Sequence, residues 1–167
     1  SQDPNKIVWF TVGQDGRFLH TADRGKTWGE SEFEGGVPKG SWNRASYFYK
    51  QAVVADPLKG DVFYAYNWTT KNLYRSEDGG KTFRIAGRVP SELGNYHCKL
   101  RAVPGESGRL FFTNGLNNDK FTDTGMGPLY ESKDGGATWT EVPNTEKIID
   151  IAFGAPAPGN DFPTWYV

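Results

Sequence analysis

Two aspartates in one glycine-bounded segment are the first candidates for chemistry in this sequence. Asp119 and Asp123 lie four residues apart between Gly115 and Gly127. A pair of carboxyl groups can act as general acid and general base, and an inverting glycosidase holds its two carboxyls about 6.5–9.5 Å apart across the scissile bond. Four residues of loop do not define such a separation. Solvated acidic residues are common on loops, so this pair by itself does not predict catalysis.

Aromatic side chains flanked by amides and carboxylates suggest a second chemistry, which is sugar binding. Aromatic rings stack on the C–H faces of a sugar, whose hydroxyls need paired donors and acceptors. The candidates lie in the segments 35–50, 67–71, 91–97 and 115–127, and they are Trp42, Tyr47, Tyr49, Trp68, Tyr96, Asn117, Asp119 and Phe121. The competing interpretation is that some of these rings pack beneath their own loops.

The remaining reactive residues do not predict a site. Cys98 is the single cysteine, which excludes an internal disulfide and a cysteine-based zinc site. His97 precedes it, but neighbouring residues on a strand point to opposite faces, so we expect Cys98 to be a small packed side chain. We expect neither a metal nor a cofactor. Asn67-Trp68-Thr69 matches the glycosylation sequon, a pattern short enough to arise by chance.

Three copies of one short motif determine how these candidates are positioned. The motif reads Ser/Thr-x-Asp-x-Gly-x-Thr-aromatic, and its aspartates, Asp23, Asp78 and Asp134, are 55 and 56 residues apart. A fixed period of this size indicates a repeat architecture. We call each copy a box. The box residues are Asp23, Gly25, Thr27 and Trp28; Asp78, Gly80, Thr82 and Phe83; and Asp134, Gly136, Thr138 and Trp139.

The residue types of the box predict a structural role. The aspartate can accept backbone N–H groups of its own turn, the glycine can adopt positive φ, and the aromatic side chain can pack between neighbouring sheets. Gly80-Lys81-Thr82 ends like a phosphate-binding loop, but that loop needs a glycine where Arg75 stands. A calcium loop needs several oxygen ligands, and each box supplies one carboxylate and at most a neighbour.

Superposing the repeats predicts four strands in each full unit, because β-branched and aromatic residues gather between turn residues. The second unit has segments 52–56, 61–66, 72–76 and 82–87, and the third has 99–103, 109–113, 128–132 and 138–142. The first unit lacks an opening strand and has 7–12, 17–21 and 27–32. The last unit supplies 148–153 and 164–167.

This repeat predicts an all-β fold, a β-propeller segment of about three four-stranded blades with box hairpins. We expect a partial blade over 5–50, full blades over 51–98 and 99–147, and a partial blade over 148–167. The segment would be part of a larger propeller or be completed by other chains, since open blade faces leave apolar surface and strand edges uncovered. Residues 1–4 resemble the remnant of an affinity tag.

Composition excludes some partners. The 19 basic and 20 acidic residues balance, so no bulk field favours nucleic acid, and no apolar run reaches the roughly 18 residues of a membrane span.

Up-and-down blades place the boxes at one end, and the long aromatic segments at the other. Long loops on one end of a rigid scaffold are where binding residues concentrate.

Several sequence runs resemble a known family. The boxes resemble the Asp-box (BNR) repeats that sialidases and several glycoside hydrolases share. More specific runs are 54–57 with 62–66, 73–76 before the second box, 101–105, and 151–159 ending in 165–167. In this order they resemble part of the second, C-terminal β-propeller of the glycoside hydrolase family 74 xyloglucanases, over nearly the whole chain.

The resemblance implies a secreted inverting enzyme with two seven-bladed propellers facing each other across a cleft for xyloglucan, a xylose-branched β-1,4-glucan. Its catalytic aspartates come from the first propeller and from a Gly-Asp-x-Gly-Gly-Phe-like stretch near the start of the second. That stretch does not occur here, so no catalytic residue is expected in this segment, which would contribute sugar-binding loops and be inactive alone. The alternative is a non-catalytic Asp-box propeller that binds glycan or protein.

Overall fold

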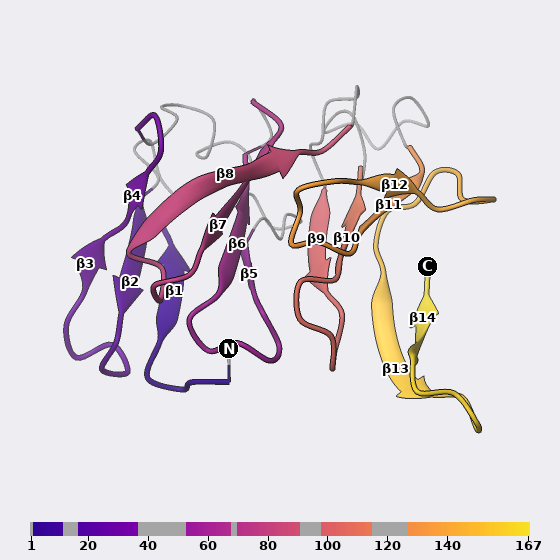
Figure 1. Cartoon of the computed structure of the whole chain (residues 1–167), viewed down its shortest axis with the longest axis horizontal. Coiled ribbons are helices and arrows are strands. Elements are labelled where there is room, and N and C mark those ends of the chain that lie inside the picture. The colour runs from indigo at the N-terminus through magenta and orange to yellow at the C-terminus, as the bar shows by residue number, and fades with distance from the viewer. Residues whose placement is uncertain (1, 12–16, 37–52, 68–69, 91–97, 115–126) are drawn as a thin grey trace.

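Strands built from the predicted segments form four small sheets that follow one another along the chain. A computed structural model describes residues 2–11, 17–36, 53–67, 70–90, 98–114 and 127–167. Figure 1 shows the sheets side by side in chain order, from indigo at the N-terminus to yellow at the C-terminus. All fourteen elements of the described residues are strands, as the all-β prediction requires.

Each sheet is antiparallel between neighbours in sequence, apart from one added strand in the second. The first sheet has the order β1-β2-β3, with β1 Ile7–Phe10, β2 Phe18–Thr21 and β3 Gly29–Glu30. The second has the order β4-β8-β7-β6-β5, with β4 Glu32–Phe33, β5 Val53–Ala55, β6 Phe63–Tyr66, β7 Asn72–Ser76 and β8 Thr82–Arg88. The third has the order β12-β11-β10-β9, with β9 Lys99–Ala102, β10 Leu110–Thr113, β11 Leu129–Ser132 and β12 Thr140–Glu141. The fourth pairs β13 Ala152–Pro156 with β14 Pro163–Tyr166.

Three apolar clusters fill the spaces between successive sheets. Phe18 of the first sheet is buried in one cluster with Phe63 and Tyr74 of the second, and its ring lies 5.9 Å from that of Phe83. Tyr66 of the second sheet lies on Phe112 of the third, with ring centroids 4.5 Å apart. The third cluster joins the third sheet to the fourth, and its buried members are Val103, Phe111, Leu129 and Ile151. Since burying one such side chain is worth about 1.5–3 kcal/mol, each cluster stabilises the two sheets that it joins.

The first unit departs from the predicted single strand over 27–32. Strand β3 ends at Glu30. The next strand, β4, crosses to the outer edge of the second sheet, where it runs parallel to β8. Phe33 accounts for the crossing, since its ring stacks on Phe83 at 4.7 Å and 9° and is buried in the cluster between the two sheets. The buried aromatic area outweighs continuation of a short edge strand.

The last unit begins its strand later than predicted, at Ala152 rather than residue 148. The carbonyls of Ile149 and Ile151 accept hydrogen bonds from side chains of the third sheet, Thr113 Oγ1 at 2.9 Å and Arg101 Nε at 3.2 Å. These residues therefore dock on the neighbouring sheet before the chain enters a ladder.

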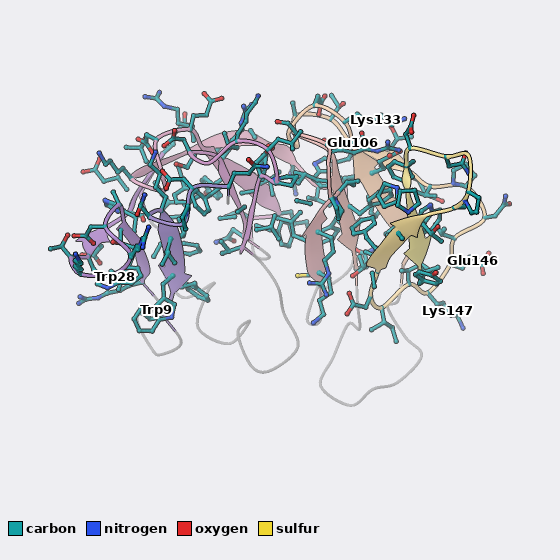
Figure 2. The ribbon with its side chains drawn as sticks, turned by 90° about the horizontal axis from the view of Figure 1, so that it is seen from below. Trp9, Trp28, Glu106, Lys133, Glu146 and Lys147 are labelled. Carbon is teal, nitrogen blue, oxygen red and sulfur yellow. The ribbon has the colours of Figure 1, made fainter. Side chains whose placement is uncertain are left out.

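The boxes lie at one end of the sheets together with the turns that join first and second strands. Gly79 N–H donates to the Asp61 carbonyl at 2.9 Å, and Gly135 N–H donates to the Gly108 carbonyl at 2.8 Å. Figure 2 labels Glu106 and Lys133, from these two kinds of turn in the third sheet, close to each other. The strand ends that lead into the long aromatic segments lie at the opposite end, as predicted.

Candidate functional site

The eight predicted sugar-binding residues all lie outside the described residues. Trp42, Tyr47 and Tyr49 fall in 37–52, Trp68 in 68–69 and Tyr96 in 91–97; Asn117, Asp119 and Phe121 fall in 115–126, as does Asp123. Their role therefore stays a prediction. The structure does describe the strand ends that carry these segments, at Asn67, Val89 and Asn114.

Two buried asparagines lie at the end of the sheets opposite the boxes, where the long aromatic segments begin. Asn67 and Asn114 follow β6 and β10 at equivalent positions, and they are 0% and 1% exposed. Asn67 Oδ1 accepts the Thr70 N–H at 3.0 Å, so its side chain is used to turn the chain. A glycan acceptor must be reached from solvent, which argues against modification of the sequon that begins at Asn67.

The boxes have one geometry in all three copies. The first box residue, Thr21, Ser76 or Ser132, donates its hydroxyl to the box aspartate at 2.7, 2.8 and 2.9 Å. The same hydroxyl oxygen accepts the N–H of the box glycine at 3.0, 2.9 and 2.8 Å. The box threonine donates both its N–H, at 2.9 Å, and its hydroxyl, at 2.6 Å, to the aspartate in every copy.

These hydrogen bonds hold the box carboxylates in the ionised form. The Thr27 hydroxyl and N–H lower the pKa of Asp23 far below its usual range. Burial alone would raise the pKa of Asp78, but bonds from Thr82 and Ser76 outweigh it and lower that pKa. The pKa of Asp134 is lowered in the same way. A carboxylate held ionised by its own turn is a poor general acid, which supports the structural role that the sequence predicts for the boxes.

The box glycines reveal a second role that sequence reasoning missed. All three have positive φ, of 84° at Gly25, 90° at Gly80 and 88° at Gly136. A Cβ at Gly80 would lie 2.3 Å from Val8 of the first sheet, and one at Gly136 would lie 1.8 Å from Leu73 of the second. The box therefore joins a sheet to the one before it as well as closing its own hairpin.

The box aromatics do not all pack between sheets as predicted. Phe83 is 1% exposed in the cluster between the first two sheets, and Trp139 is half-buried against Phe112. Trp28, however, is 40% exposed. The reason is that no described sheet lies on the side of the first sheet that Trp28 faces.

Asp56 is the most heavily bonded carboxylate of the described residues. It is 0% exposed and accepts the N–H groups of Leu58 and Lys59 at 2.9 and 3.0 Å. Across the boundary with the third sheet it accepts the Gly108 N–H at 2.8 Å. Burial would raise its pKa, but these backbone bonds lower it. Asp56 thus links the second sheet to the third, and we call this set of hydrogen bonds the Asp56 clamp. In the sequence, Asp56 stands out only as part of the run 54–57 that resembles the family.

Tyr64 shares this clamp. Its hydroxyl donates to Asp56 Oδ2 at 3.1 Å, and burial together with the Asp56 charge raises the pKa of the phenol far above its usual range. The phenol therefore stays protonated and serves as a donor.

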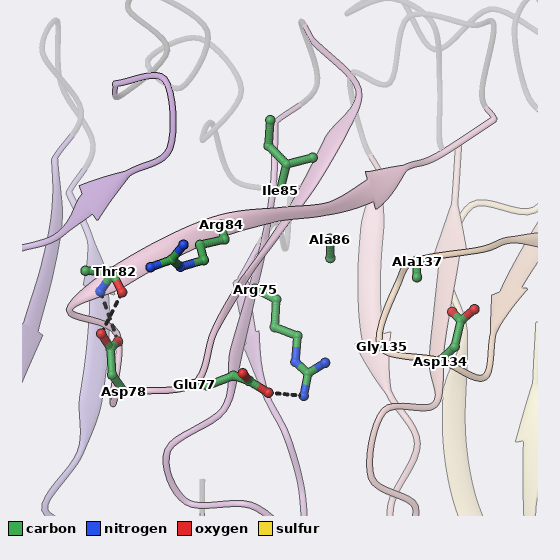
Figure 3. Close-up of a pocket in the computed structure, with 10 residues that line it drawn as sticks. All are labelled: Arg75, Glu77, Asp78, Thr82, Arg84, Ile85, Ala86, Asp134, Gly135 and Ala137. Atoms are coloured by element: carbon green, nitrogen blue, oxygen red, sulfur yellow. Dashed lines mark hydrogen bonds and ion pairs between the residues drawn. The ribbon is translucent and has the colours of Figure 1, made fainter.

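A recess of about 430 Å³ lies between the second and third boxes (Figure 3). Arg75 lines it and forms an ion pair with Glu77 at 2.5 Å, while its Nε is buried with no hydrogen-bond partner among the described residues. Two further carboxylates, Asp78 and Asp134, are bound in their own turns. The recess therefore brings together no free acid and base that could catalyse hydrolysis.

The other expectations concern metals, the cysteine and membranes. Within the described ranges no group of three or more His, Cys, Asp or Glu residues is placed to hold a metal ion. Cys98 is 1% exposed in the cluster between the second and third sheets, which confirms it as a packed side chain. The described residues contain no helix that could span a membrane.

The chain was also compared with known protein families, sequences and solved structures. No protein-family model matches the chain. A xyloglucanase of Paenibacillus sp is 31% identical over 168 residues, which cover 99% of this chain and 14% of that protein. A solved family 74 glycoside hydrolase (GH74) from Niastella koreensis superposes with a TM-score of 0.73 at 24% identity, over 99% of this chain and 21% of that one. An ancestral GH74 enzyme gives a TM-score of 0.53 at 16% identity, over 91% of this chain and 19% of that one.

Two conclusions follow. The fold is that of a β-propeller segment, as predicted. The chain resembles part of a family 74 propeller over nearly its whole length, and it spans a small fraction of the length of each relative.

Proposed function

We propose, on the premise that this chain corresponds to part of a family 74 propeller, that it is a segment of a secreted polysaccharide-degrading glycoside hydrolase. The parent would be an inverting endo-β-1,4-glucanase acting on xyloglucan. The observation that carries the proposal is the 31% identity to a xyloglucanase over 99% of the chain. The remaining blades would come from the rest of the parent or from other chains.

Within that enzyme the segment supplies sugar-contacting loops and no catalytic aspartate. The three box aspartates and Asp56 all accept hydrogen bonds from hydroxyl or backbone donors of the scaffold; the box aspartates are Asp23, Asp78 and Asp134. The aromatic candidates belong to the segments at the opposite end. A rigid scaffold with long segments at one end is a common arrangement for ligand binding.

A hydrolysis assay with the purified chain tests whether this segment lacks catalytic activity of its own. We expect no release of reducing ends from tamarind-type xyloglucan, because the residues that the structure describes assemble no acid and base pair. Clear turnover by a homogeneous preparation would contradict this.

Binding by the longer enzyme tests the contribution of the loops. Trp68→Ala and Trp42→Ala should raise the KM for xyloglucan and leave the melting temperature nearly unchanged, because stacking on sugar is lost and no core is disturbed. Leu58→Ala is the matched control, since Leu58 is 48% exposed in a turn at the box end. A large fall in melting temperature with unchanged KM would make these tryptophans core residues. Absence of any glycan hydrolysis by the longer protein would favour the non-catalytic propeller.

A further inference from the structure

The loop that leads from the third sheet to the fourth contains two backbone outliers close together. Four non-glycine residues of the described chain have positive φ, and two of them, Asn144 at 59° and Lys147 at 55°, lie in this loop. The left-handed region is unfavourable for a residue with a Cβ, and asparagine tolerates it better than lysine does. Such residues persist where the surrounding structure holds them, and they gather at ligand-binding sites. The position of Lys147 therefore directs attention to what its side chain lines.

Hydrogen bonds to the start of β11 fix the backbone of this loop. The Thr145 hydroxyl accepts the Leu129 N–H at 3.1 Å, and Thr145 is 9% exposed. After the loop, the Ile148 N–H donates to the Gly127 carbonyl at 3.0 Å. The two exposed residues between these anchors therefore project from a backbone that is bonded to the sheet on both sides of them.

A recess of about 360 Å³ opens beside these two residues, Glu146 and Lys147. Its wall on the third sheet includes Tyr130 and Glu141, which pair directly across β11 and β12. Side chains of such a pair lie on the same face, with Cβ atoms about 4.5–5.5 Å apart. Figure 2 labels Glu146 and Lys147 next to each other at the surface. The volume is within the range of small-molecule sites, about 300–1,000 Å³.

The second sheet covers the equivalent position with its own chain. Tyr74 and Tyr130 are equivalent, because each lies two residues before the serine of a box. Tyr74 is 3% exposed and meets the Phe33 ring edge to face at 5.1 Å and 76°. Its cross-strand partner is Ile85, whereas Tyr130 has Glu141. Tyr130 is half-buried, so the third sheet presents an aromatic side chain beside a carboxylate where the second sheet has an apolar contact.

The recess lies at the outer edge of the third sheet and at the end opposite the boxes. β12 is one edge strand of this sheet, and β9, its first strand, is the other. Blades of a propeller surround a central channel, and their first strands lie nearest to it. The described walls of the recess include none of the eight residues that the sequence predicts to bind sugar.

The charges at the recess favour a neutral ligand that carries hydroxyl groups. Glu141 and Glu146 bring two negative charges, and Lys147 brings one positive charge. The excess negative charge opposes an anion, and the nearby ammonium opposes a cation. Sugar hydroxyls can donate to carboxylates and accept from an ammonium, and such charge-assisted hydrogen bonds are stronger than neutral ones. Tyr130 adds an aromatic side chain against which the C–H groups of a sugar ring can pack.

We propose that Tyr130, Glu141, Glu146 and Lys147 form a binding site for one neutral sugar residue of a glucan, at the outer edge of the third sheet. The proposal rests on the proposed function in taking a glycan as the ligand. The site holds a part of the chain, or a branch, that lies away from the propeller axis, and it contributes to binding rather than to cleavage. The left-handed backbone at Lys147 keeps its ammonium beside the recess.

Titration of the full chain, labelled with nitrogen-15, with the xylose-branched heptasaccharide of xyloglucan tests the site. We expect the amide resonances of residues 145–147 to shift in a saturable way, and those of the three boxes to stay in place. Glu146→Ala should weaken binding about fivefold, because one charge-assisted hydrogen bond is lost. Asp161→Ala is the matched control, since it removes an exposed carboxylate in the turn between β13 and β14 and should leave the affinity unchanged.

Replacement of Lys147 by glycine separates binding from a purely structural role. Lys147→Gly removes the ammonium and relieves a positive φ, so the melting temperature should rise while the affinity for the heptasaccharide falls about fivefold or more. Asn144→Gly relieves a positive φ in the same loop but outside the recess, and it should leave the affinity unchanged. Unchanged affinity in Lys147→Gly and in Glu146→Ala overturns the proposal.

The same titration distinguishes this site from the proposed function. Shifts at Asn67, Val89 and Asn114 with none at residues 145–147 would overturn the site and support glycan binding by the long segments. Tighter binding of glucosamine tetramer than of the heptasaccharide would assign the recess to a cationic ligand and overturn the proposal. Absence of any shift overturns the site as well, whereas the proposed function is decided by hydrolysis with the longer protein.

Discussion

Replacement of Gly136 by alanine is the sharpest test of the contact between box and neighbouring sheet. Gly136 has a φ of 88°, and a Cβ there would lie 1.8 Å from Leu73 Cδ2 and 3.2 Å from its Cγ. The left-handed backbone costs an alanine about 1–2 kcal/mol. Displacing a fully buried leucine adds an overpacking cost of about 1–3 kcal/mol. Gly136→Ala should therefore lower the free energy of unfolding by about 2–5 kcal/mol.

A matched glycine separates the two costs. Gly105 has a φ of 81°, and a Cβ there would meet no atom within 4 Å. Gly105→Ala should thus show the backbone cost alone, about 1–2 kcal/mol. Gly25→Ala should resemble Gly105→Ala more closely than Gly136→Ala, since its neighbour is the half-exposed ring of Trp28.

Urea unfolding followed by circular dichroism measures all three variants. The double variant Gly136→Ala, Leu73→Ala completes a cycle, in which the alanine at Gly136 should cost less once the leucine is truncated. Equal destabilisation by Gly136→Ala and Gly105→Ala would refute the contact. A cycle that is additive within error would do the same.

Three other predictions concern the carboxylates and the aromatic cluster. The pKa of Asp78 is lower in the folded protein than its usual value of about 3.8. The ionised carboxylate therefore contributes its full stabilisation above pH 3.8, and this contribution is lost as the pH falls through the lower folded pKa. Asp78→Asn should flatten the acid side of a plot of melting temperature against pH. Asp56→Ala should cost roughly 3 kcal/mol in urea unfolding, because it leaves buried N–H groups without an acceptor, whereas the same change at the exposed Asp161 should alter stability little. Phe33→Ala should cost about 3–5 kcal/mol, and retention of wild-type stability would show that the crossing of β4 contributes nothing.

The repeat explains why so much of the fold could be predicted from sequence. The box spacing aligned the units, and alternating apolar residues then located the strands; β7 begins and ends where expected, at Asn72 and Ser76. The crossing of β4 could not be predicted, because it depends on Phe33 meeting Phe83 of another unit. The late start of β13 depends likewise on hydrogen bonds from Thr113 and Arg101 of the preceding sheet.

The candidate site was harder to predict than the scaffold. The chemistry of the box was readable from its residue types, because its hydrogen bonds are local. The contact of Gly136 with Leu73 is not local, although two of the three boxes share the Gly-Gly pair that accompanies it. Asp56 could have been suspected from Asp-Pro followed by a glycine turn, but its bond to Gly108 spans two units. The sugar-binding residues remain predictions because they lie outside the described residues.

The crossing of β4 also bears on how the chain comes apart. Glu32 and Glu34 donate backbone hydrogen bonds to Lys81 and Phe83 at 2.8 and 2.9 Å, while the adjacent Ser31 donates its N–H to Phe18 of the first sheet at 2.9 Å, so one short segment ties the first two sheets together through the backbone. The fourth sheet is held to the third by side chains such as Arg101, which bonds Asp150 at 3.0 Å. Opening should therefore begin at the C-terminal sheet, and proteases should trim the chain from that side. The first two sheets should exchange their amide hydrogens as one cooperative unit.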